Sequence, residues 1–470
     1  MSRLVNVSNR VSVPRKTAAP GGLALGVLEA MKARGGLWFG WSGELTAEGD
    51  SSPSLTKRGD ITFATIDLPA DDYSLHYGGF CNSTLWPLCH YFLDTFRYRD
   101  DEYAAYHRIN ARFAAGMRPL LRPNDLIWVH DYQLFPLGQR LRELGVGLPI
   151  GFFLHIPFPH IEALRALPVH AEIMETLLAY DLIGVQTRRD AASLRSAAIE
   201  LWGERAIADD GSIVRGSRRV AVDVFPIGVD VDGIQRDALA SQSRDAVQRL
   251  VDGLRGRRCV IGVDRLDYSK GLVERFTAYE RFLQDNPQNL NRITFLQIAP
   301  LSRAEVRTYA DIRRLLEQAA GRTNGRFADT DWTPIRYLNR NFPHPDLMGF
   351  MRNSSVGLVT PVRDGMNLVA KEYIAAQDPD DPGVLVLSSL AGAALELKDA
   401  LLVNPNDIRG VAAAIQHALT MPLDERRERH RRMLATLRHN DIHAWHSRFL
   451  QRLEKAARLR RQPSREHEVA

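Results

Sequence analysis

The stretch GVDRLDYSKGL, residues 262–272, joins the end of a predicted buried strand to the start of a predicted helix. An apolar, β-branched run from Cys259 to Val263 ends abruptly in charged residues, and amphipathic sequence resumes at Leu272. Such a run is typical of a strand buried on both faces, and the helical pattern after it indicates a strand–turn–helix unit of a parallel sheet. The turn also carries Arg265 and Lys270, which a turn by itself does not need. An anion at the open end of a parallel sheet would need both.

The same alternation of short apolar runs and helical pattern recurs along the chain. The clearest predicted strands are residues 4–7, 126–129, 150–154, 182–185, 220–225, 259–263, 293–298, 356–359, 384–387 and 401–403. Strands that alternate with helices indicate right-handed βαβ units, so the predicted fold class is α/β with parallel sheets.

At 470 residues the chain is too long for one ordinary core, so we expect two domains. The predicted boundary is PIGVDVD, residues 226–232, where a strand ends in Pro-x-Gly before a polar, helical stretch at 233–257. From Asn406 onward the pattern is almost wholly helical.

The composition excludes several classes of protein. With 61 basic and 56 acidic residues the net charge is +5, and no clustered basic face indicates nucleic-acid binding. The basic runs at 425–432 and 458–465 are interpreted as a solvated helix face and a frayed tail. No apolar segment approaches the ~18 residues of a membrane span, and no signal peptide is visible. Three cysteines without metal-ligand spacing favour a reducing compartment, so the predicted location is the cytoplasm.

Polar, cationic or glycine-rich sequence follows six of the predicted strands, where ligands of open α/β sheets bind. These segments are residues 8–10, 130–132, 155–159, 264–271, 299–303 and 360–367. Six such strand ends together predict a site between two sheets.

Arg265 and Lys270 suit a diphosphate, because arginine offers a bidentate fork and lysine a compact charge near the start of a helix. The alternative is a pair of surface cations at a loop. Neither the G-x-x-x-x-G-K-[ST] motif nor a strand-linked G-x-G-x-x-G is present. Whatever anion binds here is not held by a P-loop.

RDGMNLVAKE, residues 363–372, is the most informative helix start. Gly365 lets the backbone approach a ligand, and the amides of Met366 and Asn367 are donors at the first turn. Asp364 can accept from sugar hydroxyls, and Glu372 from a further pair such as those of a ribose. The alternative is a capping acid and a solvated glutamate.

Two arginines from different halves of the chain could grip a second phosphate. Ser302 begins a predicted capping box, which puts Arg303 in a first helical turn against the helix dipole, and Arg10 ends the first strand. His155 could donate to a sugar hydroxyl, although a lone histidine is more often structural. Tyr77 and Trp86 fit either core packing or a sugar platform. The helically spaced histidines at 439, 443 and 446 lack a carboxylate partner, so no metal site is predicted.

These residues resemble glycosyltransferase family 20. The resemblance covers roughly residues 3–450 and is carried by SNR, PGGL, GGFCNSTLWP, WVHDY, GFFLHIPFP, VFPIGVD, GVDRLDYSKGL, QIAPLSR, TPVRDGMNLVAKEY and NPND. It implies a GT-B fold, in which two Rossmann-like domains with parallel sheets face a central cleft. The implied domains are an acceptor-binding one at 1–228, which regains a helix at about 440–458, and a nucleotide-sugar-binding one at 229–439. Residues 459–470 are expected to be a disordered tail.

The resemblance implies that glucose moves from UDP-glucose to glucose 6-phosphate with retention, giving trehalose 6-phosphate and UDP. The implied catalytic residues are His155, Asp131, Arg265, Lys270 and Asp364. The implied donor site is Gly22, Leu23, Arg265, Lys270, Phe342, Asp364, Gly365, Met366, Asn367, Leu368, Val369 and Glu372. The implied acceptor site is Arg10, Tyr77, Trp86, Asp131 and Arg303.

Two alternatives stay open at this point. One is a glucosyltransferase with a smaller phosphorylated acceptor such as glycerol 3-phosphate, because Arg10 and Arg303 would serve either phosphate. The other is a non-catalytic sugar-phosphate sensor, which the presence of Arg265, Lys270 and Asp364 disfavours. No cofactor or metal is predicted, the expected partners are the two substrates, and a homodimer or homotetramer is left open.

Overall fold

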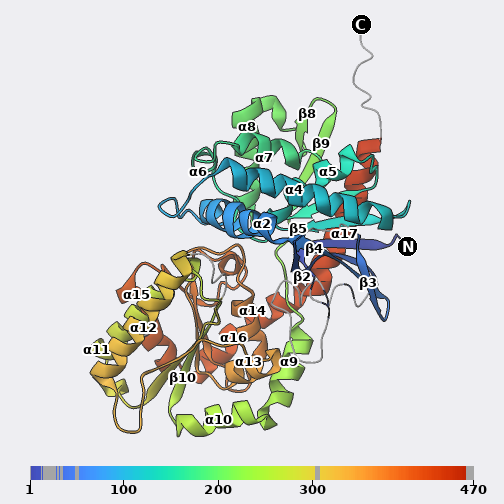
Figure 1. Ribbon diagram of the computed structural model, residues 1–470. Coiled ribbons are helices and arrows are strands. Elements are labelled where there is room, and N and C mark those ends of the chain that lie inside the picture. Colours follow the sequence, from blue (N-terminus) through green and yellow to red (C-terminus); the bar gives the residue numbers. More distant parts are fainter. Residues whose placement is uncertain are drawn as a thin grey trace. The chain divides into compact units, whose positions relative to one another are not determined.

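The computed structural model in Figure 1 describes residues 2–11, 13, 28, 31, 35–47, 52–301 and 307–461. These residues form two compact units. Unit 1 contains those up to Pro226 and from His443 onward, and unit 2 contains Ile227–Ile442. The chain therefore crosses between the units twice, directly after Pro226 and directly before His443.

Unit 1 is built on a nine-stranded sheet of order β3-β4-β2-β1-β5-β6-β7-β9-β8. The pairing is parallel except at the two edges, where β3 and β8 run antiparallel to β4 and β9. The chain order reverses between β1 and β5, so a crevice is expected at the carboxyl ends of these two strands. The strands are β1 (Leu4–Arg10), β2 (Gly36–Thr46), β3 (Ser54–Arg58), β4 (Ile61–Pro69), β5 (Leu126–His130), β6 (Ile150–Phe153), β7 (Leu182–Val185), β8 (Ile213–Arg215) and β9 (Arg218–Val224).

The helices of unit 1 connect these strands and cover the sheet. They are α2 (Ala70–Tyr73), the π-helix η1 (Ser74–Leu85), α3 (Trp86–Cys89), α4 (Asp100–Met117), η2 (Arg118–Leu120), η3 (Tyr132–Leu134), α5 (Leu137–Glu143), α6 (Ile161–Leu164), α7 (His170–Leu177), α8 (Arg188–Trp202), η4 (Glu204–Ala206) and, from His443 on, α17 (Ile442–Arg461).

The C-terminal helix α17 packs directly on the sheet of unit 1. Phe449 stacks on Trp128 of β5 with ring centroids 4.2 Å apart. A Cβ added at Gly151 or Gly184, on β6 and β7, would lie 2.8 Å from the Phe449 ring, so both glycines make room for it. The helix continues to Arg461. Residues 459–461, the start of the tail expected to be disordered, belong to this helix, and the rest of that tail lies outside the described residues.

Unit 2 is built on a six-stranded, wholly parallel sheet of order β12-β11-β10-β13-β14-β15. The strands are β10 (Arg258–Val263), β11 (Ile293–Ile298), β12 (Ile335–Leu338), β13 (Val356–Val359), β14 (Val384–Ser388) and β15 (Leu401–Val403). The chain order reverses between β10 and β13, so the carboxyl ends of these two strands flank the crevice of a doubly wound sheet.

The helices of unit 2 lie on both faces of its sheet (Figure 1). The helices α11, α12 and α15 lie on one side, and α13, α14 and α16 lie on the other. They are α9 (Val231–Ala240), η5 (Ser241–Ser243), α10 (Asp245–Leu254), η6 (Tyr268–Lys270), α11 (Leu272–Asp285), η7 (Pro287–Asn289), α12 (Arg307–Phe327), α13 (His344–Arg352), α14 (Leu368–Ala376), η8 (Gly392–Leu395), α15 (Ile408–Thr420) and α16 (Leu423–His439).

The ten predicted strands are confirmed, and five further strands were not predicted. These five, β2, β3, β4, β8 and β12, mix polar residues with apolar ones, so none of them is a continuous apolar run. Among the described residues, no helix is both long enough and apolar enough to pass through a bilayer.

Candidate active site

The crevice expected in unit 2 from its strand order is bordered by the turn after β10 and the loop after β13. In the turn, Asp267 accepts hydrogen bonds from the backbone N–H and the hydroxyl of Ser269, at 3.0 and 2.9 Å. Gly271 has a φ of 62°, and a Cβ there would lie 2.4 Å from the carbonyl oxygen of Thr360. Only glycine fits this left-handed, close approach, which lets the two segments touch.

The two segments are joined by an ion pair between Lys270 and Asp364. Both side chains are largely shielded, with exposed fractions of 13% and 15%. Asn367 donates from Nδ2 to the same carboxylate at 3.0 Å, and its Oδ1 caps α14 by accepting from the Ala370 N–H at 3.1 Å. The structure thus brings together three predicted donor-site residues, while Arg265 stands exposed on the same turn.

The backbone of the loop after β13 is held from the other side by the segment after β14. The Ala393 N–H donates to the Met366 carbonyl at 2.8 Å. A Cβ added at Gly392 would lie 1.9 Å from the carbonyl oxygen of Gly365, so the close backbone approach here depends on Gly392. Leu368 and Val369 begin α14 and are partly exposed. The helix therefore starts at a crevice with its N-terminal turn fixed in place, a geometry that suits an anion.

Two further predicted donor-site residues lie on neighbouring elements. Burial raises the pKa of the Glu372 carboxyl on α14, and nearby His344 opposes that rise. Phe342, just before α13, lies under the Arg340 guanidinium at 4.6 Å and makes an edge contact with Phe350. A partly exposed ring beside an arginine offers a flat surface on which a base could stack.

Sequence reasoning missed two buried cations behind this crevice, Arg275 on α11 and Lys371 on α14. Lys371 donates to Glu396 at 2.6 Å and to the Ile227 carbonyl at 2.7 Å, and burial lowers its pKa. A charged residue among the apolar residues of a buried helix face was the available signal. It is weak, because the same pattern fits a lysine whose amine reaches solvent.

In unit 1, Arg10 and Tyr77 lie at opposite ends of a row of stacked side chains. The Arg10 guanidinium lies 5.4 Å from the centroid of Trp41, whose ring is 4.4 Å from that of Tyr73. Tyr73 stacks in turn on Tyr77 at 5.3 Å and 12°. This row crosses from β1 and β2 to η1 and presents a cation and an aromatic face at one end of the sheet.

Asp131 and His155 meet at the carboxyl ends of β5 and β6. The Asp131 carboxylate accepts from the His155 backbone N–H at 3.1 Å. Asp131 has a φ of 77° and a ψ of 166°, a conformation that is costly for any residue but glycine and is most often found at functional sites. The structure thus fixes His155 through its backbone and leaves its ring to other partners.

The His155 ring lies in a group of buried, neutral polar side chains. Its Nε2 is 3.2 Å from Nδ1 of His130, whose Nε2 is 3.2 Å from the amide oxygen of Asn6. Burial lowers the pKa of His155 to about 3 and that of His130 well below its ordinary value. At neutral pH, His155 can therefore act as a hydrogen-bonding group but not as a cation.

Trp86 does not join the row of Arg10 and Tyr77. It is buried with 4% exposure, stacks on His90 at 4.1 Å and lies 5.8 Å from the ring of Tyr132. Trp86 could either pack in the core or form a platform for a sugar, and these contacts are those of core packing. The remaining predicted site residues, Gly22, Leu23 and Arg303, lie outside the described residues.

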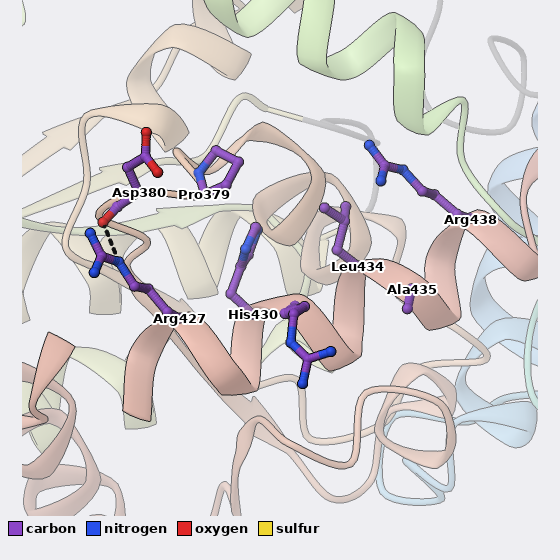
Figure 2. A pocket seen from close by; sticks show the side chains of 8 residues that line it. Pro379, Asp380, Arg427, His430, Leu434, Ala435 and Arg438 are labelled. Carbon is purple, nitrogen blue, oxygen red and sulfur yellow. Dashed lines mark hydrogen bonds between the residues drawn. The ribbon is translucent and has the colours of Figure 1, made fainter. Parts of the chain in front are cut away.

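A cavity of about 770 Å³ lies elsewhere in unit 2, along α16 (Figure 2). It is lined by Pro379, Asp380, Arg427, His430, Arg431, Leu434, Ala435 and Arg438. Arg427 donates to the Asp380 carbonyl at 2.8 Å, as the dashed line in Figure 2 shows. Because residues 379–380 lead into β14, this cavity is at the amino edge of the sheet, away from the crevice where ligands of such sheets bind. Within the described residues, no cluster of three or more His, Cys, Asp or Glu could hold a metal ion.

Comparison with known proteins decides the family. The family model of glycosyltransferase family 20 matches residues 5–455. The chain belongs to glycosyltransferase family 20. A trehalose-6-phosphate synthase of Klebsiella pneumoniae is 49% identical, with 97% of this chain and 95% of the relative covered.

Solved structures of family members have the same fold. An alpha,alpha-trehalose-phosphate synthase (UDP-forming) from Burkholderia vietnamiensis is 51% identical and superposes with a TM-score of 0.95, covering 98% of this chain and 99% of that one. A UDP-forming synthase from Burkholderia xenovorans, solved in complex with glucose-6-phosphate, is 46% identical with a TM-score of 0.91, covering 96% of this chain and 100% of that one. The GT-B fold expected from the sequence is thereby confirmed.

Proposed function

We propose that the protein transfers glucose from UDP-glucose to glucose 6-phosphate, giving trehalose 6-phosphate and UDP. The observation that carries this proposal is the Lys270–Asp364 pair at the crevice of unit 2, in a family 20 chain whose close relatives are UDP-forming synthases. A nucleotide sugar needs a cation for its diphosphate and an acceptor for its sugar hydroxyls. Lys270 and Asp364 supply these two groups side by side.

On the donor side, Arg265 and Lys270 neutralise the diphosphate, and the N-terminus of α14 adds amide donors. Asp364 and Asn367 hold the glucose, Glu372 accepts from the ribose hydroxyls, and the base lies against Phe342. When the bond from glucose C1 to the phosphate oxygen breaks, negative charge grows on the leaving UDP. Fixed cations at that oxygen stabilise the transition state more than the bound substrate, which raises the rate.

On the acceptor side, Arg10 binds the phosphate of glucose 6-phosphate, and Tyr77 and Asp131 bind its sugar. Arg10, Tyr77 and Asp131 all belong to unit 1. His155, held neutral, donates or accepts a hydrogen bond at the donor glucose. Gly22, Leu23 and Arg303 complete the site as the family resemblance implies.

We propose that the reaction proceeds with retention by attack on the same face that UDP leaves. The acceptor 1-hydroxyl forms the new bond to C1, and its proton passes to the phosphate oxygen that departs. No carboxylate nucleophile is then required beneath the anomeric carbon, which the two-step alternative would need. We also propose a cytoplasmic location and a homo-oligomer, neither of which the reaction itself depends on.

The test is a UDP-release assay with UDP-glucose and, in parallel, glucose 6-phosphate or glycerol 3-phosphate as acceptor. We expect turnover with glucose 6-phosphate, and its loss in Arg265→Ala. Turnover with glycerol 3-phosphate alone would keep the donor and replace the acceptor. A wild type that releases UDP with neither acceptor would overturn the proposal.

A further inference from the structure

Arg275 is a charged residue that faces no solvent. The exposed fraction of its side chain is 0%, and that of its partner Asp264 is 2%. It therefore cannot touch a ligand in the crevice. We propose that Arg275 is the positioning residue of the donor site, whose guanidinium sets the turn after β10 and the loop after β13 at the spacing that a diphosphate requires. This inference rests on the function proposed above.

The guanidinium donates to four acceptors on three segments, namely the turn after β10, the strand β11 and the residue directly after β13. Nε donates to the Thr360 hydroxyl at 3.0 Å, Nη1 donates to Asp264 at 2.5 Å and to Gln297 at 3.0 Å, and Nη2 donates to the Lys270 carbonyl at 3.2 Å. These partners lie after β13, after β10, on β11 and in η6. One planar group thus fixes the backbone of Lys270 and the start of the loop that carries Asp364.

The two segments fixed by Arg275 are the two whose side chains meet in the Lys270–Asp364 pair. They are also linked by their backbones, since the Val362 N–H donates to the Ser269 carbonyl at 2.9 Å. A small shift of either segment would move an ammonium or a carboxylate off its place in the crevice. Misplacement by about 1 Å can cost an enzyme about 100-fold in rate, so the spacing itself has catalytic value.

A glycine in β10, Gly262, leaves space for this guanidinium where a strand would ordinarily carry a residue with a side chain. A Cβ added at Gly262 of β10 would lie 2.8 Å from Nη1 of Arg275 and 2.4 Å from Oε1 of Gln297. Because a buried ion pair is on average no more stabilising than apolar residues of similar volume, stability alone does not account for it. Burial raises the pKa of Asp264, which means that removing this carboxylate from water destabilises its charged form.

Unit 1 offers a matched control in Arg142. Its side chain is largely shielded, with 11% exposure, and donates to the Asp181 carboxylate at 2.9 Å. It also donates to the carbonyls of Val146, Leu148 and Ala179. Asp181 directly precedes β7, so this network lies at the amino edge of the unit 1 sheet, away from the carboxyl ends of β1 and β5. Arg142→Lys should therefore lower stability without altering ligand affinity.

The experiment compares Arg275→Lys with Arg142→Lys in the full chain. Lysine keeps the charge beside Asp264, but an ammonium cannot span all four acceptors as a planar fork does. We expect Arg275→Lys to weaken UDP binding, measured by calorimetry, and to lower kcat/KM for UDP-glucose by about 100-fold. The KM for glucose 6-phosphate should stay unchanged, and Arg142→Lys should lower Tm only.

Other outcomes would separate this inference from the proposed function. Two results in an active wild type would show that Arg275 does not position the donor site. In the first, Arg275→Lys binds UDP as tightly as the wild type does. In the second, Arg275→Lys and Arg142→Lys lose affinity for both substrates to the same extent. If Arg275→Lys does not fold, Thr360→Val decides, because it removes the acceptor of Nε alone. Unchanged UDP affinity in a folded Thr360→Val would overturn the inference. A wild type without turnover counts against the proposed function instead.

Discussion

Each sheet reverses its chain order at one pair of strands, but the polar groups at the two carboxyl edges differ. At the edge of unit 2, the buried or shielded groups are ions: Asp264 with Arg275, and Lys270 with Asp364. At the edge of unit 1, two uncharged rings, His130 and His155, lie beside the Asp131 carboxylate, and the cation Arg10 stands exposed. Ions suit the side where a diphosphate must gain charge as it leaves, whereas neutral hydrogen-bonding groups suit the orientation of sugars.

The largest expected effect follows from removing a cation of the unit 2 edge. Lys270→Ala should lower kcat for UDP release by roughly 100- to 1,000-fold, because the charge that grows on the leaving group loses its counterion. Lys270→Arg, which keeps the charge, serves as the control and should retain more activity. If Lys270→Ala raised only the KM for glucose 6-phosphate, the division of roles between the edges would be wrong.

A smaller effect is expected from Asp364→Asn, which should tighten UDP binding but lower turnover. The carboxylate pairs with Lys270 in the unliganded protein, so its neutralisation should tighten UDP binding by roughly fivefold, about 1 kcal/mol. Turnover should nevertheless fall, because the sugar loses its acceptor. Calorimetry with UDP and the UDP-release assay measure the two effects.

The matched control for this variant is Asp399→Asn, which changes the net charge of unit 2 equally. Asp399 pairs with Arg432 of α16. Equal tightening of UDP in both variants would point to bulk charge rather than to the pair.

Acid should unfold unit 1 before unit 2. Burial lowers the pKa of His76 and His155 to about 3, so below about pH 6.5 the unfolded chain binds protons that folded unit 1 does not, and stability falls as pH falls. In unit 2, burial raises the pKa of Asp264 and Glu372, which works in the opposite direction. Of the seven tryptophans, Trp332 lies in unit 2, so Trp332→Phe confines tryptophan fluorescence to unit 1. Coincident acid transitions by this fluorescence and by circular dichroism would break the comparison.

The last prediction is that His155 does not change its protonation state between pH 5.5 and 8. A histidine with a pKa near its ordinary value would produce an inflection near pH 6.5 in kcat/KM. Because His155 has a pKa of about 3, no inflection from it should appear between pH 5.5 and 8. The ring nitrogen NMR shifts of His155 should likewise stay constant over this range, and a change near pH 6.5 would mean that the ring is not held neutral.

The sequence by itself determined the class of fold and the strand ends that carry chemistry. Apolar runs such as Cys259–Val263 and Ile293–Ile298 are local features, because a strand buried on both faces must be apolar along its whole length. The segments after them stand out because charges such as Arg265 and Lys270 interrupt that pattern. Strands with mixed residues, such as β3 and β4, were not predicted, because polar residues interrupt any apolar run in them.

Only the tertiary structure decided which of these groups meet. That Lys270 pairs with Asp364, 94 residues further on, follows from the adjacency of β10 and β13, which no local pattern encodes. That Trp86 packs in the core while Tyr77 ends a row from Arg10 also depends on folding. Arg275 was invisible in sequence for the same reason: its acceptors lie on three separate segments, and a buried polar group acquires its role from partners that the fold assembles.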